Sequence, residues 1–448
     1  MQTTAPSRGP AFAMSTPPAA VGTGLGMSNT GDVRLAAAHF AVAILFLIAG
    51  TVALVWISPL LATGLFLSPH VAGVTHLFTL GWLTTTIFGA LYQLLPVALG
   101  TPIRWRRMGY ASFAAFAPGV ALFSAGVAMN HNVLHHVGIA LVSTGVVLAT
   151  VNFAVSLSKA SGRDITWYAV ATAIAALSST LILGIVLLHN LHTGFLGGLR
   201  VRLLSTHLHI ALVGWALVMM VGMAHRLLPM FLLAHGADTQ WSMRALALLT
   251  AGTLALSAGL LAALDILTFT GAILLAIGVA CFSRQARLFF RARMRRKLDV
   301  GMRFSATGLM FLAAAVPLGL LSLVDGNRQA RVATAYVILG MLGGIVMFVI
   351  GHFYKIVPFL AWITHQRRRR GNEPIPAIIE LYSARAAFAQ WVLMTISIPM
   401  LVAGTLAGHA HCVRAGAIFF GAGVVLFVSQ FVRIAWPLRG AVAKGPEA

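Results

Sequence analysis

Twelve long apolar stretches, separated by short polar segments, follow one another along the chain. Each stretch is long enough for an α-helix to cross the ~30 Å hydrocarbon core of a bilayer. The pattern therefore predicts an all-α, polytopic membrane protein with twelve transmembrane helices. The predicted spans are residues 36–58, 71–97, 108–129, 134–157, 166–189, 203–232, 243–264, 266–286, 303–324, 332–363, 385–407 and 413–436.

Composition supports lipid as the solvent for this chain. Of its 448 residues, 59% are hydrophobic and only 9% are charged, which is more apolar surface than a soluble protein of this length could bury. Residues 1–33 are rich in Pro, Gly, Ser and Thr, so we expect a disordered cytoplasmic tail there. A membrane domain at 34–436 and a second cytoplasmic tail at 437–448 follow.

Basic residues predict the orientation, because loops rich in Lys and Arg stay on the cytoplasmic side. The loops that follow even-numbered spans and their flanks hold nineteen Lys and Arg residues, whereas the opposite side holds five. Both termini are therefore expected in the cytoplasm of a bacterial cell, with the protein in its cytoplasmic membrane. The arginine-rich loop 284–303 fits an anionic lipid leaflet, and no nucleic-acid partner is expected. Cys281 and Cys412 fall on opposite sides and are not expected to form a disulfide.

One motif of the predicted membrane helices occurs three times in the sequence. Each copy has a glycine five residues after its first position, a second glycine eight residues later and a proline seven residues after that. The copies are His76, Gly81, Gly89 and Pro96; His209, Gly214, Gly222 and Pro229; and Ile338, Gly343, Gly351 and Pro358. Consecutive copies lie four spans apart. The chain is thus predicted to form three parallel four-helix repeats, at about 34–160, 161–290 and 300–436, around a pseudo-threefold axis.

Two copies begin with a histidine, and an ionisable side chain inside a membrane indicates function. His76 and His209 each lie about one turn inside the outer end of a span. Equivalent positions in neighbouring repeats predict that both imidazoles face one gap, while the glycines clear room for a flat macrocycle. This arrangement suits haem iron between two histidines. His207 lies two residues from His209, so it points to another side and would serve a second metal.

Most of the remaining histidines also fall toward the outer face. Imidazole binds iron, copper and zinc without needing a charge. A candidate metal site therefore consists of His131, His135, His136, His189, His409 and His411. His70 and His192, at span ends, are instead expected to lie in the headgroup zone.

The segment Thr206-His207-Leu208-His209, with Gly214, Trp215, Gly222 and a Leu-Leu-Pro ending, resembles the tenth helix of the cbb-type haem–copper oxidase catalytic subunit. The copy that starts at His76 resembles it too. That family folds as three arcs of four helices. The resemblance implies that His76 and His209 bind a low-spin haem b and that His207 is a ligand of the high-spin type. The pattern is also similar to the NnrS-type membrane proteins of denitrifying bacteria, which are thought to hold haem and copper.

The chain departs from the oxidases in its third copy, where Ile338 replaces the histidine, and it lacks their copper-ligand motifs. No Asp or Glu lies in a predicted membrane core, so proton pumping has no obvious carriers. The expected function is respiratory electron transfer or nitric oxide metabolism, with a quinol or a c-type cytochrome as electron donor. Whether the protein is an oxidoreductase stays open. Two alternatives also stay open: a carrier or chaperone for copper or haem, and a structural subunit without a cofactor.

Overall fold

The computed structural model describes residues 32–234, 236, 238–294, 296–324, 329–368 and 377–443, and these residues form helices without any strand. The predicted tail at 1–33 lies, except for its last two residues, outside this part. Twelve helices are long and apolar enough to cross a membrane, which confirms the predicted all-α membrane fold. They are Val33–Trp56 (α1), Pro69–Leu99 (α3 to α4), Arg106–Ala128 (α5), Asn132–Ser158 (α6), Ile165–Thr193 (α7), Leu199–Leu232 (α8 to α9), Gln240–Ala262 (α10), Asp265–Arg291 (α11), Val300–Leu321 (α12), Gln329–Thr364 (α13 to α14), Ala384–Ala407 (α15) and Ala410–Ile434 (α16).

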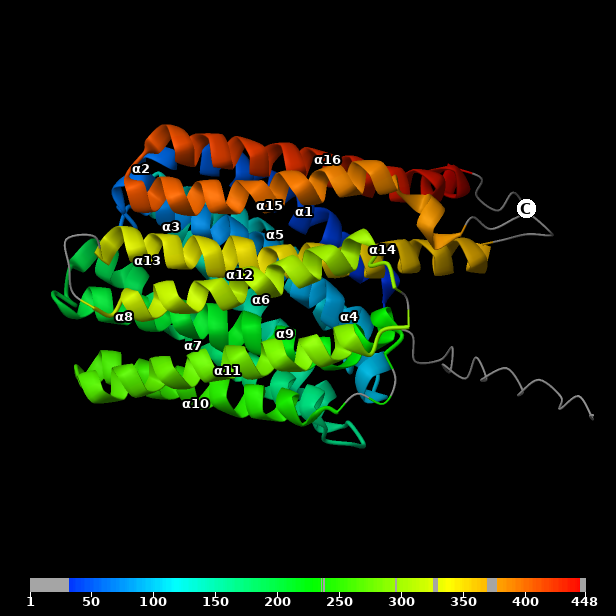
Figure 1. The fold of residues 1–448 in the computed structure, drawn as a ribbon, viewed down its shortest axis with the longest axis horizontal. Helices are drawn as coiled ribbons and strands as arrows, with labels where there is room; N and C mark the ends of the chain where they lie inside the picture. Colours follow the sequence, from blue (N-terminus) through cyan, green and yellow to red (C-terminus); the bar gives the residue numbers. More distant parts are fainter. Residues whose placement is uncertain are drawn as a thin grey trace, which may run out of the picture.

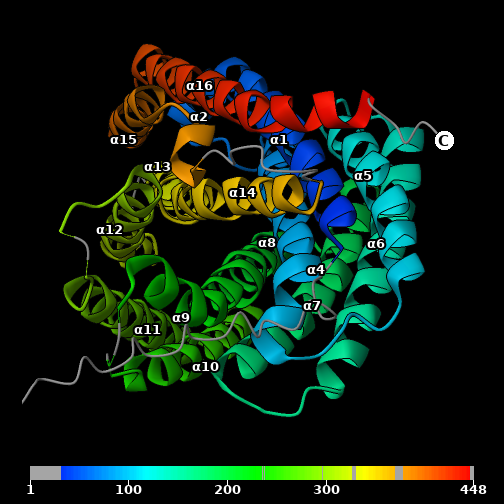
Figure 2. The same ribbon diagram turned by 90° about the vertical axis from the view of Figure 1, so that its right-hand side faces the viewer.

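The helices run side by side along the long axis of the molecule (Figure 1). Two short helices add to them, α2 (Ser58–Thr63) after the first span and a 3₁₀ turn at Ile378–Leu381. At its C-terminal end α14 continues to Arg368, and α16 continues to Ala443, past the predicted start of the second tail at residue 437. Seen along the helices, the spans from the first, second and third parts of the chain follow one another around the bundle (Figure 2).

The three spans that carry the repeated motif are the most enclosed. In their most apolar windows, 72%, 61% and 72% of the residues are buried, against at most 50% in any other span. Lipid solvates apolar side chains as well as protein does, so burial inside the bundle is not required by hydrophobicity alone. Their position accounts for it, because α4, α8 and α14 lie toward the middle of the bundle (Figure 2), and the paired glycines let neighbouring helices approach them closely.

Each motif-bearing span contains a π-helical segment at the same place in the motif. In the first, α3 (Pro69–His76) is followed by Leu77–Thr84 and then by α4 (Thr85–Leu99). The π-helical segments of the other two spans are Ile210–Leu217, after α8 (Leu199–His209), and Ile338–Val346, after α13 (Gln329–Val337). Such wide turns are rare and are frequent at functional sites. The first two begin directly after His76 and His209.

In each group of four spans, a side-chain amide joins the fourth span to the third in the same way. An oxygen on the last helix of the group accepts a hydrogen bond from a backbone N–H at the start of the third. The pairs are Asn152 with Trp105, at 3.1 Å, Gln285 with Ser242, at 3.1 Å, and Gln430 with Ser383, at 2.7 Å. N–H groups at helix starts lack the usual carbonyl partner four residues earlier, so the amide oxygens satisfy them; the Ser242 N–H also donates to the Thr239 carbonyl oxygen. The matching clamps support the predicted repeat.

An aspartate caps the first span of each group. Asp32, Asp164 and Asp299 each accept hydrogen bonds from the first backbone N–H groups of the helix that follows. Each carboxylate also pairs with a cation: with Arg106, Arg226 and Lys355, respectively. Burial alone would raise the pKa of the Asp164 carboxyl, but hydrogen bonds from the Trp167 N–H and from Arg226 outweigh it and hold the pKa below its ordinary value. The stabilisation from this depressed pKa is present at neutral pH and is lost as the pH falls through it.

Glycines bring the backbones of neighbouring helices into contact. A Cβ atom at Gly271 on α11 would overlap the backbone nitrogen of Leu256 on α10, and one at Gly126 on α5 would overlap that of His135 on α6. Helix pairs in membranes associate through such small residues, which allow close packing along their whole length. These two helix hairpins therefore depend on glycine at the crossing points.

The predicted orientation can be tested at two exposed glycines with open space around them, Gly162 and Gly198. They precede and follow α7, whose length places them at opposite membrane faces. In a chain whose free Cys281 and Cys412 are replaced by serine, we expect Gly162→Cys to react with a membrane-impermeant maleimide only from the cytoplasmic side. Gly198→Cys should react only from outside. Reaction of both from one side would reject the twelve-span topology.

Candidate functional site

A large cavity lies at the end of the bundle that holds α3, α8 and α13, and its volume is about 930 Å³. Cofactor sites of this size are common, with mostly apolar walls and a few placed polar groups. Here the walls are mainly Leu, Val, Ala and Phe, and the polar groups include all three candidate histidines of the motif region, His76, His207 and His209. The cavity thus lies where the N-terminal ends of the three motif-bearing spans meet.

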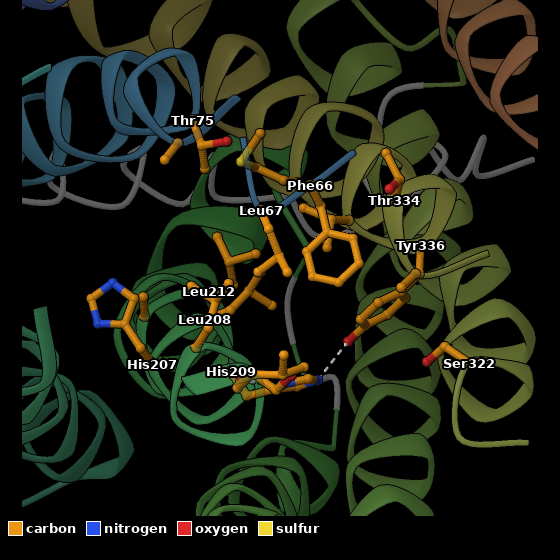
Figure 3. Close-up of a pocket in the computed structure, with 18 of the residues that line it drawn as sticks. Phe66, Leu67, Thr75, His207, Leu208, His209, Leu212, Ser322, Thr334 and Tyr336 are labelled. Atoms are coloured by element: carbon orange, nitrogen blue, oxygen red, sulfur yellow. Dashed lines mark hydrogen bonds between the residues drawn. The ribbon is translucent and has the colours of Figure 1, made fainter. Parts of the chain in front are cut away.

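His209 faces the cavity with a defined tautomer. Its Nδ1 lies 2.8 Å from the carbonyl oxygen of Ser205, one turn earlier on α8. A carbonyl only accepts, so Nδ1 carries the proton and the lone pair is on Nε2. The Tyr336 hydroxyl donates to that Nε2 across 3.4 Å, as the dashed line in Figure 3 marks. The two rings are nearly parallel, with centroids 6.0 Å apart.

His76 is held in the same way in the first repeat. Its Nδ1 donates to the carbonyl oxygen of Ala72 across 2.7 Å, which leaves Nε2 with the lone pair. The edge of its ring meets Phe123, with centroids 5.0 Å apart. His76 and His209 therefore share both their position in the motif and their backbone anchor. An anchor of this kind is typical of metal-bound histidines, because it fixes the ring and makes Nε2 the ligand.

His207 points away from His209, as the two-residue spacing predicts (Figure 3). Its ring lies beside that of His76, with centroids 6.4 Å apart, and its Cε1 faces Gly184, where an added Cβ would stand 3.2 Å away. The sequence interpretation placed His76 and His209 across one gap. In the structure both line the same cavity, the ring beside His76 is that of His207, and the ring beside His209 is that of Tyr336.

Sequence reasoning did not single out Tyr336, although a signal was present. Tyr336 stands two residues before Ile338, just as His207 stands two residues before His209. The third copy therefore has a phenol at the position of His207, and it provides a polar group to the cavity where the motif histidine is missing.

Outside the cavity, the structure gathers only some of the outer-face histidines that the sequence offered as metal ligands. Within the described residues, the group close enough to share an ion is His135, His136 and His192. The first two were predicted, whereas His192 was assigned to the headgroup zone. His131 caps α6 instead, accepting from the Leu134 N–H at 3.4 Å, and His189 packs against Phe195. His409 and His411 are exposed at the start of α16.

Comparison of the chain with protein-family models and with curated proteins gave no match. The functional assignment therefore depends on the cavity and on the side chains around it.

Proposed function

We propose that the protein is a haem-binding membrane protein of respiratory electron transfer or nitric oxide metabolism, with haem b in the outer cavity. The observation that carries the proposal is the matched pair His76 and His209. Each lines the cavity at the same motif position, and each has its Nδ1–H committed to a backbone carbonyl so that Nε2 is free to bind iron.

The cavity suits such a group in size and chemistry. About 930 Å³ with mainly apolar walls accommodates a flat macrocycle and keeps water away from it. Arg200 and Arg202 also line the cavity, and their guanidinium groups complement the carboxylates that haem carries. A copper ion is a further candidate ligand near His207, because imidazole suits copper as well as iron.

In this proposal His76 and His209 would hold the haem through their Nε2 atoms. Haem held by two imidazoles would supply one-electron transfer. Tyr336 donates to the Nε2 of His209, so its hydroxyl must turn away before that nitrogen can bind iron. His207, beside His76, would then be the residue that serves a second metal with an open position.

A carrier or chaperone for copper or haem is the second candidate. The observation that favours it is the neighbourhood of the cavity: Leu191 lines it, and the next residue, His192, belongs to an exposed histidine group on the outer face. A path from that face into the cavity would suit delivery of a metal or of haem.

The optical spectrum of the purified full-length chain separates the two candidates. We expect the sharp reduced bands of low-spin haem b, at about one haem or more per chain. Copper without haem would support the carrier and contradict the haem protein. A preparation that lacks both, from cells that supply both, would reject the two proposals together.

A further inference from the structure

Three imidazoles from two helices meet on the outer face, apart from the side chains that line the cavity. His135 and His136 lie in the first turns of α6 (Asn132–Ser158), and His192 lies in the last turn of α7 (Ile165–Thr193). Their ring centroids are 4.5 to 5.4 Å apart, and one ligand nitrogen from each lies within 4.8 Å of the others. We propose that this triple-histidine cluster binds one divalent transition-metal ion, Cu²⁺ or Zn²⁺. The inference does not depend on haem in the cavity.

The packing of α6 against α5 holds one histidine of the cluster in place. His135 is fully buried, and its backbone packs directly on Gly126 of α5, where a Cβ would collide with it. The Nδ1–H of His136 donates to the Asn132 carbonyl oxygen across 2.7 Å, so the lone pair of its Nε2 is free. His136 and His192 are exposed. One rigid ligand and two accessible ones allow an ion to enter from the outside.

The close approach within the cluster also points to an ion. The Nε2 atoms of His135 and His192 are 2.7 Å apart and share a hydrogen bond, which commits one proton between two nitrogens. With metal–nitrogen bonds of ~2.0–2.1 Å, two tetrahedral ligands stand roughly 3.3 Å apart. Small side-chain rotations would therefore convert the hydrogen-bonded pair into two metal ligands. A hydrogen bond between two histidines does not explain why His136 lies against both.

The donor set selects the class of ion. Three neutral imidazoles, with no carboxylate or thiolate in the cluster, favour Cu²⁺ and Zn²⁺ over Mg²⁺ and Ca²⁺, which prefer oxygen. Among divalent ions of the first row, Cu²⁺ binds such sites most tightly. Three protein ligands leave the fourth position for water or for a ligand from a partner. The partial negative charge at the end of α7 favours a cation, while the start of α6 opposes it.

The test is a titration of the metal-free, full-length protein in detergent with Cu²⁺ and, separately, Zn²⁺. His136→Ala and His192→Ala should each weaken binding of the first equivalent by about tenfold or more, since even the loss of an outer-shell partner costs that much. The electron paramagnetic resonance spectrum of the Cu²⁺ form should show coupling to imidazole nitrogens and should lose part of it in both variants. His189→Ala is the matched control, on the same helix but packed on Phe195.

Wild-type affinity in both cluster variants would overturn the proposal, and so would an equal loss in His189→Ala. Both variants change exposed side chains and should fold, whereas His135 is buried and is left unchanged. The haem spectrum serves as an independent readout. Cluster variants should keep whatever haem the wild type holds, so failure of the haem proposal and failure of this one are distinguishable.

Discussion

Alanine in place of His76 or of His209 is expected to remove low-spin haem from the purified protein. Each residue would provide one of the two nitrogens that hold the haem, so its loss should lower the haem content by roughly tenfold or more. His207→Ala should retain the low-spin haem, because the proposal gives His207 a second metal and not the haem. Reduced optical spectra and electron paramagnetic resonance, scaled to protein concentration, measure the three outcomes.

His70→Ala is the matched control for this series. His70 is also an outer-face histidine, but its ring packs against Trp56. It should keep the wild-type spectrum. Unchanged spectra in all three cavity variants would refute the ligand assignment. Loss of haem in His76→Ala and His207→Ala alone would instead identify the neighbouring pair, with ring centroids 6.4 Å apart, as the ligands.

Leucine at Gly271 should prevent α10 and α11 from packing and should abolish most of the folded protein. The new Cβ alone would overlap the backbone of Leu256, so relief requires the helices to move apart rather than a side chain to turn. Overpacking of this kind costs about 3 kcal/mol or more. The measurement is the yield of monodisperse protein after detergent extraction, together with its thermal unfolding midpoint.

Gly162→Leu is the control for that experiment. It makes the same change at an exposed loop position where no atom lies within 4 Å of an added Cβ. We expect wild-type yield and stability from it. A Gly271→Leu protein that is as abundant and as stable as the control would show that the close crossing of α10 and α11 is not required for folding.

The membrane spans could be predicted because each depends only on the hydropathy of its own residues. The predicted span 385–407 corresponds to Ala384–Ala407, and 203–232 corresponds to Leu199–Leu232. Asp265–Arg291 continues five residues past the prediction into its arginine-rich end. Long arginine stems allow a helix to extend beyond the apolar core while the charge reaches the headgroups. The π-helical segments were not predictable, since apolar residues of this kind fit either helix.

The site was predictable only in part, because it depends on which helix ends meet. Motif spacing identified His76, His207 and His209 as candidates, and all three line the cavity. Whether they bind haem remains a prediction. Sequence position could not pair His192 with His135, because fifty-seven residues separate them and their contact follows from the packing of α6 against α7. Tyr336 was not predicted, because only histidines were expected as ligands and the third copy has a tyrosine at the position that corresponds to His207.

The three amide clamps bear on the order in which the chain assembles. Asn152, Gln285 and Gln430 each join the fourth helix of their own group to the third, so this pair of helices can lock together as soon as the fourth helix is inserted. The cavity, in contrast, takes its walls from all three groups, and Tyr336 comes from the last of them. A membrane-embedded chain still under synthesis would therefore already hold its first two groups, with His76 and His209 in place, while the wall of the cavity that contains Tyr336 would be added only after the ribosome had delivered the final third.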